Sequence, residues 1–264
     1  MQYIDIGLNL FCSQFHNPDA VLEQARKAGV LCILTGSDME ENARIDVYSR
    51  TQRVFGTCGI HPHNADRACE KDWEKITCYL RENPAFVAVG EVGLDYNRMF
   101  SEKDRQLRNL ERHIRISDDT GKPMFLHERD AAQDMMAVFR AVPDICRRSV
   151  IHCFTGDEKI LEQYLDMGFY IGITGWICDE RRGADLQRAA RIMPIDRVML
   201  ETDAPYLTPR GIPGLSRVNV PENVRYVARK LAQCMQVDED LLRRHALDNT
   251  CRFFGIQAGN ENET

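Results

Sequence analysis

The sequence lacks the features that define several protein classes. No stretch without a charged residue exceeds Ile6–Pro18, which has 13 residues, and Met167–Cys178 has 12. Both are well short of the roughly 20 apolar residues that a membrane-spanning helix needs. Basic residues are not in excess, because 34 Lys and Arg stand against 40 Asp and Glu and leave a net charge of -6. A global positive field that gathers nucleic acid is thereby excluded. Any contact with phosphate groups must come from local clusters of Lys or Arg.

Closely spaced cysteines are also missing. The 10 cysteines are scattered, no two lie three positions apart, and Cys32, Cys58 and Cys153 sit within apolar runs. We therefore expect reduced thiols that pack as small hydrophobic groups. The first residues, Met1–Asp5, lack the basic start and the apolar run of a secretory signal. We expect a cytoplasmic protein without a membrane association or an obligate protein partner.

The 264 residues, of which 44% are hydrophobic and 28% charged, are typical of a globular enzyme. Short runs rich in strand-forming residues alternate with helical patterns eight times. This alternation predicts an α/β protein and favours a single-domain (β/α)8 TIM barrel. The alternative, an open doubly wound sheet, usually has only five or six strands. We expect one domain over residues 1–258 and a polar tail over 259–264. The expected strands are 3–10, 31–35, 54–59, 86–91, 123–127, 149–154, 169–174 and 198–203.

One of the intervening helices has clear expected boundaries. Ser101, followed by Asp104 three positions later, predicts a capping box at its start, and Gly121 predicts its end. We expect the apolar residues of this helix to form its buried face and His113 to be solvated.

Four potential metal ligands close four of the expected strands: Glu91, His127, His152 and Asp203. In a parallel barrel the loops after the strands converge on one face, where functional residues gather. Each of the four follows an apolar run, so burying it costs several kcal/mol unless it is paired or bound to a cation. Any one of them alone could be an ordinary residue of the barrel rim. Together they predict a site for a divalent cation. Their nitrogen and oxygen ligands suit Zn²⁺, Mn²⁺ or Mg²⁺, and we expect Mg²⁺.

Two further histidines, His61 and His63, follow the third expected strand and flank Pro62, which limits the directions in which their rings can point. They could be additional ligands or hydrogen-bond donors to an oxyanion of the substrate. A polar loop that only covers the barrel is the alternative. We assign both to substrate binding.

Six segments that contain these residues resemble the TatD family of metal-dependent deoxyribonucleases. The segments follow one another in the same order as in the family and extend over nearly the whole chain. They are Asp5–Leu10, Gly59–His63, Gly90–Tyr96, Leu126–Ala131, Ile151–Gly156 and Leu200–Leu207. The resemblance implies a metal-dependent TIM-barrel hydrolase of the amidohydrolase type that acts as a 3′–5′ exonuclease on single-stranded DNA and RNA, in DNA degradation and repair. It also implies that Glu91, His127 and His152 bind the metal, and that Asp203 is a metal partner or the general base. Glu91 and Asp203 are thus the expected catalytic residues.

The chain departs from the family pattern near its start. Most members open with Asp-x-His-x-His, and here the two His positions are Gly7 and Asn9. Glycine has no side-chain ligand atom, and asparagine offers only a weak carbonyl. We therefore expect one well-held cation or a second site of low occupancy.

A mechanism follows from these residues as a hypothesis. A water on the cation attacks the phosphorus, and Asp203 orients that water and takes its proton. His61 and His63 are expected to face the phosphoryl oxygens. Arginines bind phosphate bidentately, and those expected on the same face are Arg129, Arg181, Arg182, Arg210 and Arg217.

Some of these assignments have alternatives. The run Asp179–Arg182 could be a self-neutralising turn rather than a phosphate site. Trp176, Tyr206 and Tyr96 could stack on bases or pack at the rim. The same metal centre also polarises a carbonyl group, so a small-molecule amidohydrolase or esterase and an aminoacyl-tRNA deacylase remain alternative functions. Salt separates them, because only phosphate recognition weakens steeply as salt rises.

Overall fold

The computed structural model describes residues 1–52 and 54–257, so the expected tail over 259–264 lies outside the described residues. Eight strands form one sheet in chain order. All eight expected strands are present, and this number and order are those of a (β/α)8 barrel, which confirms the predicted fold class. The strands are β1 (Tyr3–Leu8), β2 (Val30–Leu34), β3 (Phe55–Cys58), β4 (Phe86–Asp95), β5 (Met124–Arg129), β6 (Ser149–Ile151), β7 (Tyr170–Ile173) and β8 (Val198–Leu200).

Helices connect these strands, and their ends follow local capping chemistry. Asn17 caps the first by accepting a hydrogen bond from the Ala20 N–H at 3.1 Å. The α-helices are α1 (Pro18–Lys27), α2 (Met39–Thr51), α3 (Glu70–Glu82), α4 (Lys103–Thr120), α5 (Ala132–Phe139), α6 (Pro143–Cys146), α7 (Glu158–Met167), α8 (Ala184–Ala189), α9 (Val224–Met235) and α10 (Glu239–Phe254). Short 3-10 helices are η1 (Pro62–Arg67), η2 (Gly175–Cys178), η3 (Ala190–Ile192), η4 (Ile195–Arg197) and η5 (Pro221–Asn223).

Helix α4 begins later than the sequence predicts. Its N-cap is Glu102, without a side-chain cap, so the predicted capping box of Ser101 and Asp104 is wrong. The Ser101 hydroxyl instead donates to the carbonyl oxygen of His63 at 3.0 Å. The predicted end is confirmed, since Gly121 adopts the left-handed conformation at φ +71°.

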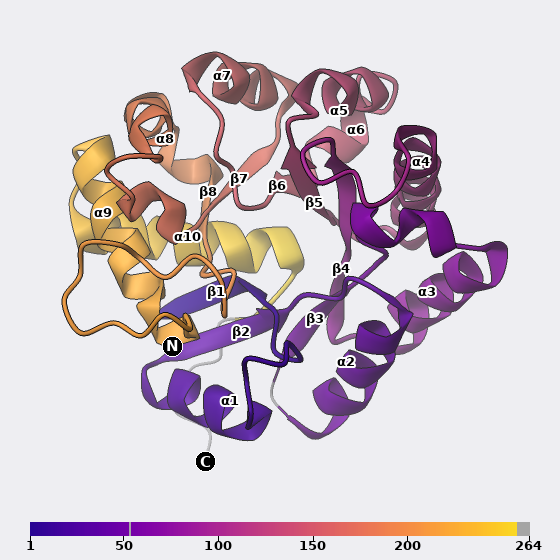
Figure 1. The fold of residues 1–264 in the computed structure, drawn as a ribbon, viewed down its shortest axis with the longest axis horizontal. Helices are drawn as coiled ribbons and strands as arrows, with labels where there is room; N and C mark the ends of the chain where they lie inside the picture. Colours follow the sequence, from indigo (N-terminus) through magenta and orange to yellow (C-terminus); the bar gives the residue numbers. More distant parts are fainter. Residues whose placement is uncertain (53, 258–264) are drawn as a thin grey trace. The chain divides into compact units, whose positions relative to one another are not determined.

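The described chain packs as two compact units. The first comprises residues 1–33, 153–163 and the chain from 171 onward, and the second comprises residues 34–152 and 164–170. The second unit contains β3 to β6, and Figure 1 shows its helices α2 to α6 on the outer side of these strands. Its core includes the fully buried rings of Phe139 and Phe169, which meet edge to face at 5.2 Å. Such pairs add about 0.5–1.5 kcal/mol to the gain from burial.

In the first unit, β7 and β8 pair in parallel, with Ile171 opposite Val198 and Ile173 opposite Leu200. Asn249 of α10 donates from Nδ2 to the carbonyl oxygens of Ile195 and Val198, both at 2.9 Å. This side chain ties the last helix to the start of β8 and satisfies buried backbone acceptors.

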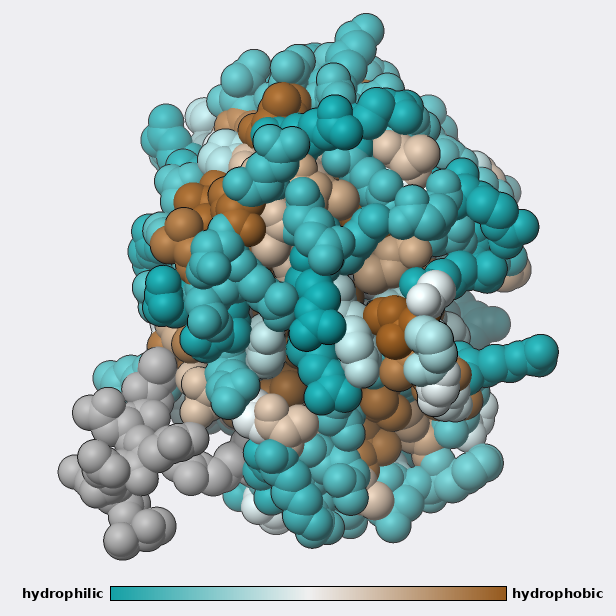
Figure 2. All heavy atoms as spheres, turned by 90° about the vertical axis from the view of Figure 1, so that its left-hand side faces the viewer, coloured by the Kyte–Doolittle hydropathy of each residue, from teal (hydrophilic) through white to brown (hydrophobic). Residues whose placement is uncertain are grey.

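Within the described residues, no helix combines the length and the apolar character that crossing a membrane requires. The face on the side of α8 and α9 is mostly hydrophilic, and its apolar side chains lie in small separate areas (Figure 2). Scattered apolar side chains of this kind are normal on a protein surface.

Candidate metal centre

Strands β4 and β5 approach each other closely beside the expected metal ligands. Gly93 pairs with His127 across the two strands, and a Cβ atom at Gly93, whose φ is +152°, would lie 1.9 Å from the carbonyl oxygen of His127. Gly90, at φ +143°, approaches the carbonyl oxygen of Phe125 in the same way, because a Cβ atom there would lie 2.2 Å from it. Only glycine fits at both positions. The two glycines thus let Glu91, which lies between them, sit beside the strand that carries His127.

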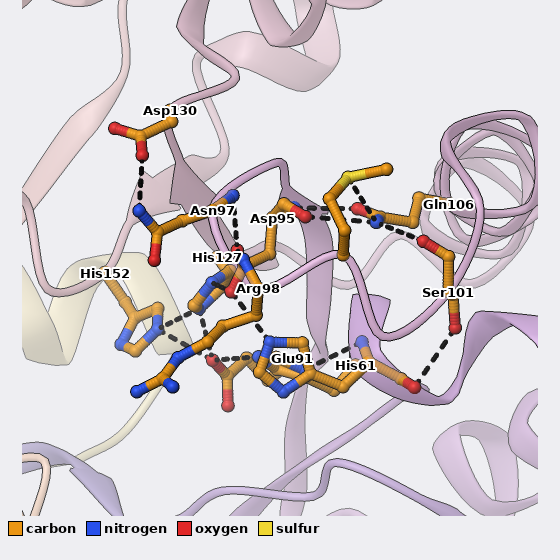
Figure 3. A network of polar contacts seen from close by, with 12 residues as sticks. His61, Glu91, Asp95, Asn97, Arg98, Ser101, Gln106, His127, Asp130 and His152 are labelled. Atoms are coloured by element: carbon orange, nitrogen blue, oxygen red, sulfur yellow. Dashed lines mark hydrogen bonds and ion pairs between the residues drawn. The ribbon is translucent and has the colours of Figure 1, made fainter.

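Three imidazole rings converge on one carboxylate oxygen of Glu91. Its Oε1 lies 2.8 Å from His152 Nε2, 3.0 Å from His127 Nδ1 and 3.2 Å from His61 Nε2. Figure 3 shows these side chains pointing toward one another. Glu91, His61 and His152 are buried. The structure therefore brings together three of the four ligands expected from the sequence and adds His61 to them.

This donor set fits a divalent cation. A carboxylate oxygen has about two lone pairs, fewer than the three ring nitrogens around Glu91 Oε1. Ligand atoms of His61, Glu91 and His127 all lie within 4.8 Å of one another, and imidazole nitrogens combined with carboxylate oxygens are ordinary ligands of divalent metals. A cation would accept lone pairs from all of these groups at once.

The protonation states of Glu91 and His61 also suit a cation. Burial by itself raises the pKa of the Glu91 carboxyl, but the surrounding His61, His152 and His127 rings outweigh burial and hold that pKa well below its ordinary range. Burial lowers the pKa of His61 to about 4. Near neutral pH, Glu91 is therefore ionised and the His61 ring is neutral, and these are the states in which both groups bind metals.

A second carboxylate, Asp95 at the end of β4, supports the ring of His127. Asp95 Oδ2 lies 3.2 Å from His127 Nε2 and 2.7 Å from His63 Nε2. Its Oδ1 accepts hydrogen bonds from the backbone N–H groups of Asn97 and Arg98, at 3.0 and 2.8 Å. Burial lowers the pKa of His127, but the bond to Asp95 is the largest contribution that raises it, and the net shift is upward. A carboxylate on the far nitrogen of a ligating imidazole orients the ring.

Asp95 was not among the site residues expected from the sequence. The predicted strand ended at Glu91, whereas β4 continues to Asp95. The apolar residues Val92 and Leu94, which alternate with Gly93 and Asp95, are the signal that could have extended the strand.

His61 is positioned by side chains of α4. Asn109 Nδ2 donates to the carbonyl oxygen of Ile60 at 2.7 Å, and His113 Nε2 accepts from the Ile60 N–H at 3.2 Å. His113 Nδ1 contacts the carbonyl oxygen of Asn109 at 2.8 Å, which makes this nitrogen the protonated one. The N–H and carbonyl groups of Ile60, the residue before His61, are thus both hydrogen-bonded to side chains of α4.

The expectation that His113 is solvated is wrong. The side chain is fully buried, and burial lowers its pKa to about 4. Position 113 lies three residues after Leu110 and one before Ile114, which places it on the buried face of α4. The helical pattern alone would have indicated this.

Asp203 lies in the first unit, in the loop after β8. Asn9 Nδ2 donates to its Oδ1 at 2.9 Å. Asn9 thus turns its amide nitrogen toward a carboxylate. The buried Asn219, which sequence reasoning did not assign to the site, donates to the carbonyl oxygens of Thr202 and Tyr206 at 3.1 and 2.7 Å and holds this loop. The metal-binding and catalytic roles of Asp203 stay predictions.

The arginines expected to bind phosphate differ in their surroundings. Arg182 Nε lies 3.0 Å from Asp179 Oδ2, and Asp179 Oδ1 accepts the backbone N–H groups of Arg181 and Arg182 at 3.0 and 3.2 Å. This turn therefore neutralises part of its own charge, as the alternative interpretation of the sequence proposed. Arg210 Nε also lies 3.1 Å from Asp179 Oδ2. Arg129 at the end of β5 and Arg217 in the loop before η5 are exposed. Substrate contacts of all five arginines stay predictions.

Two of the aromatic residues considered for base stacking, Trp176 and Tyr96, contact charged side chains of this protein. The guanidinium of Arg182 lies 4.5 Å from the centre of the Trp176 ring. The Tyr96 hydroxyl donates to Asp134 Oδ2 at 2.8 Å, and Lys103 Nζ lies 4.5 Å from the centre of the Tyr96 ring. Tyr96 therefore packs at the rim.

The chain is similar to known proteins over nearly its whole length. A curated relative from Enterobacter lignolyticus named "3′-5′ ssDNA/RNA exonuclease TatD" is 38% identical over 258 residues, which are 96% of this chain and 98% of the relative. A relative of the same name from Musicola paradisiaca is 40% identical over 258 residues, 96% of this chain and 97% of the relative. Among solved structures, the TatD homologue YJJV from Escherichia coli has 25% identity and a TM-score of 0.87, with 97% of this chain and 99% of that chain covered.

A family model described as "TatD related DNase" matches residues 4–255. This range spans β1 to α10 and includes every residue of the histidine and carboxylate cluster around Glu91. The chain belongs to the TatD related DNase family.

Proposed function

We propose that this protein is a divalent-cation-dependent 3′–5′ exonuclease that hydrolyses phosphodiester bonds of single-stranded DNA and RNA. The observation that carries the proposal is the convergence of three ring nitrogens on Glu91 Oε1 in a chain of this family. The relatives named as 3′-5′ ssDNA/RNA exonucleases support the polarity and the substrate class.

In this proposal Glu91, His61, His127 and His152 hold the cation. When bound, a divalent cation polarises a phosphoryl oxygen and lowers the pKa of a coordinated water. Asp95 keeps the ring of His127 in position through the contact at Nε2. Asp203 keeps the role of general base that the sequence predicts for it, and takes the proton of the attacking water.

Substrate contacts in this proposal come from His63 and the arginines. His63 is held by Asp95 at 2.7 Å and faces a phosphoryl oxygen. Arg129, Arg181, Arg182 and Arg217 bind the phosphates of the strand. We propose Mg²⁺ as the cation; the imidazole-rich donor set also suits Mn²⁺ and Zn²⁺.

We place this activity in the cytoplasm, with a role in nucleic-acid degradation and DNA repair. In the part of the chain that the structure describes, none of the ten cysteines forms a disulfide, which is the usual state in a reducing compartment.

The test is hydrolysis of single-stranded DNA and RNA oligonucleotides labelled at the 3′ or the 5′ end. Each is incubated with Mg²⁺, Mn²⁺, Zn²⁺ or EDTA. We expect metal-dependent release of the 3′ label as a mononucleotide, and no release by Asp203→Asn. Asp134→Asn is the matched control, because Asp134 contacts Tyr96 and Lys103 at the rim. Absence of cleavage with every metal, together with turnover of a carboxylic ester or an aminoacyl-tRNA, would replace the nuclease with a carbonyl-directed hydrolase.

A further inference from the structure

We propose that the turn after β4, Asn97–Ser101, is a nucleotide-binding subsite. In this subsite Phe100 stacks on a base of a single-stranded nucleic acid, and Arg98 pairs with a phosphate of the same strand. The inference rests on the proposed nuclease function and deepens it, by naming a surface that holds the substrate beside the cluster around Glu91.

The turn is fixed by buried groups at both of its ends. Asp95 Oδ1 accepts the N–H groups of Asn97 and Arg98, and Oδ2 of the same carboxylate contacts the rings of His127 and His63. The turn is thus attached to the carboxylate that orients a candidate metal ligand (Figure 3). Its position relative to His127 is defined before any substrate binds.

The far end of the turn is held by Gln106 and Ser101. The fully buried Gln106 accepts the Asp95 N–H at 2.7 Å through Oε1 and donates through Nε2 to the carbonyl oxygens of Asp95 and Ser101, at 3.1 and 2.9 Å. The Ser101 hydroxyl donates to the His63 carbonyl oxygen. A surface turn with this many buried hydrogen bonds is pre-organised, which lowers the entropy that binding costs.

The side chains at the tip of this fixed turn are apolar and exposed. Phe100 is 65% exposed and Met99 is 47% exposed. The Phe100 ring contacts His63 edge to face, with centroids 4.8 Å apart and the planes at 83°. Phe100 is therefore held next to a site residue while most of its surface faces solvent. A base stacked on it would bury that surface.

Arg98 supplies a cation on the same turn. Its backbone is fixed by Asp95, and its side chain is exposed. Neighbouring Asn97 donates from Nδ2 to Asp130 Oδ2 at 2.8 Å, whereas the Arg98 guanidinium forms no ion pair with any residue that the structure describes. In Figure 3 the Arg98 side chain leaves the turn on the side of the labelled histidines.

The ligand that matches this pair is a single-stranded nucleic acid. Every base has a π face, so stacking on one aromatic ring tolerates any sequence, and an arginine beside it binds the backbone phosphate. Within a duplex the bases are already stacked on one another, so an interior base has no free face for Phe100.

Binding is tested by fluorescence anisotropy with oligo(dT) labelled at its 5′ end, in EDTA so that the strand is not cleaved. We expect Phe100→Ala to weaken binding about 5-fold to 150-fold, the range for the loss of one stacked base, and Phe100→Trp to restore it. Val47→Ala on α2, which also removes an exposed apolar side chain (63% exposed), is the matched control and should bind as the unaltered protein does. We expect Arg98→Ala to reduce the slope of log K against log salt by about 1, and Arg98→Lys to retain the slope.

The base that stacks on Phe100 is identified with oligonucleotides that carry one abasic residue at the last, second-last or third-last position from the 3′ end. At one of these positions, the abasic residue should weaken binding to the unaltered protein. The same oligonucleotide should bind Phe100→Ala with the affinity that the intact oligonucleotide has for this variant. In hydrolysis with metal, Phe100→Ala should raise KM by a factor similar to its loss of affinity. Equal affinity and equal KM for Phe100→Ala and the unaltered protein would overturn the subsite.

Failure of the subsite can be told from failure of the proposed function. If the unaltered protein degrades the strand and neither Phe100 nor Arg98 affects binding or KM, only the subsite is wrong. If the unaltered protein neither binds nor degrades any strand, both proposals are wrong.

Discussion

At the scale of single residues, Asp95 connects more parts of the site than any ligand predicted from the sequence. One of its oxygens contacts the rings of His127 and His63, and the other accepts two backbone N–H groups of the following turn. The sequence pattern predicts the end of this strand at Glu91, whereas β4 continues to Asp95. Asp95 therefore follows the same rule as the predicted ligands, because it too stands at the end of a strand with apolar residues.

We expect Asp95→Asn to weaken metal binding about 10-fold to 100-fold, as other changes behind ligating histidines do. The amide cannot hold both rings and the turn as the carboxylate does. Titration calorimetry of the metal-free protein with Mn²⁺ measures this affinity, and Asp134→Asn is the matched control. Unchanged affinity in Asp95→Asn would show that the ring of His127 is oriented by other groups.

At the scale of elements, the approach of β4 to β5 depends on glycine. Gly93→Ala places a methyl group where the carbonyl oxygen of His127 lies, so we expect loss of metal binding and a destabilised fold. Gly121→Ala is the matched control: its φ is also positive, at +71°, but nothing lies within 4 Å of the added carbon. It should cost about 1–2 kcal/mol of stability and leave metal binding intact. Urea unfolding and metal titration of both variants separate the two effects, and equal metal binding in both would contradict the argument.

Helix α4 gives the protein a buried titratable group whose effect on stability has a definite sign. The unfolded chain binds a proton at His113 below pH 6.5, whereas the folded chain stays neutral there down to about pH 4. The contribution of neutral His113 is therefore complete above pH 6.5 and is lost as the pH falls from 6.5 to 4.

We expect the stability advantage of the unaltered protein over His113→Gln to shrink by about 3 kcal/mol across this range, since one pKa unit corresponds to 1.36 kcal/mol. Urea unfolding of both proteins between pH 8 and pH 4 tests this, because titrations that the two share cancel in the difference. A difference that does not change with pH would rule the prediction out.

At the scale of the whole molecule, metal binding and folding are linked. A cation that binds only the folded chain adds about 2.7 kcal/mol of stability at 100 times its Kd. We expect Tm to fall by several degrees when EDTA replaces the metal, and to be insensitive to EDTA in Glu91→Gln. Thermal unfolding by circular dichroism measures both. An equal response of the two proteins would place the stabilising cation elsewhere.

The order of the strands and much of the metal centre follow from the sequence, for a common reason. Strand-forming runs end at polar residues, and parallel strands of a barrel end on one face, so Glu91, His127 and His152 were predicted to meet. Residues that depend on contacts between distant elements could not be predicted in this way. Asn109 and Asn219 hold backbone groups of other segments, and nothing near them in the chain marks these partners.

The carboxylate of Asp95 also has a thermodynamic consequence. The Asp95 side chain contacts both the ring of His127 and the proposed nucleotide-binding turn. A bound nucleic-acid strand that further orders the turn therefore also orders the ring. Linkage is reciprocal for equilibrium binding. An oligonucleotide resistant to hydrolysis should therefore tighten metal binding by the same factor by which the metal tightens binding of the oligonucleotide. In this sense the enzyme would retain its cation best while it is engaged with a substrate.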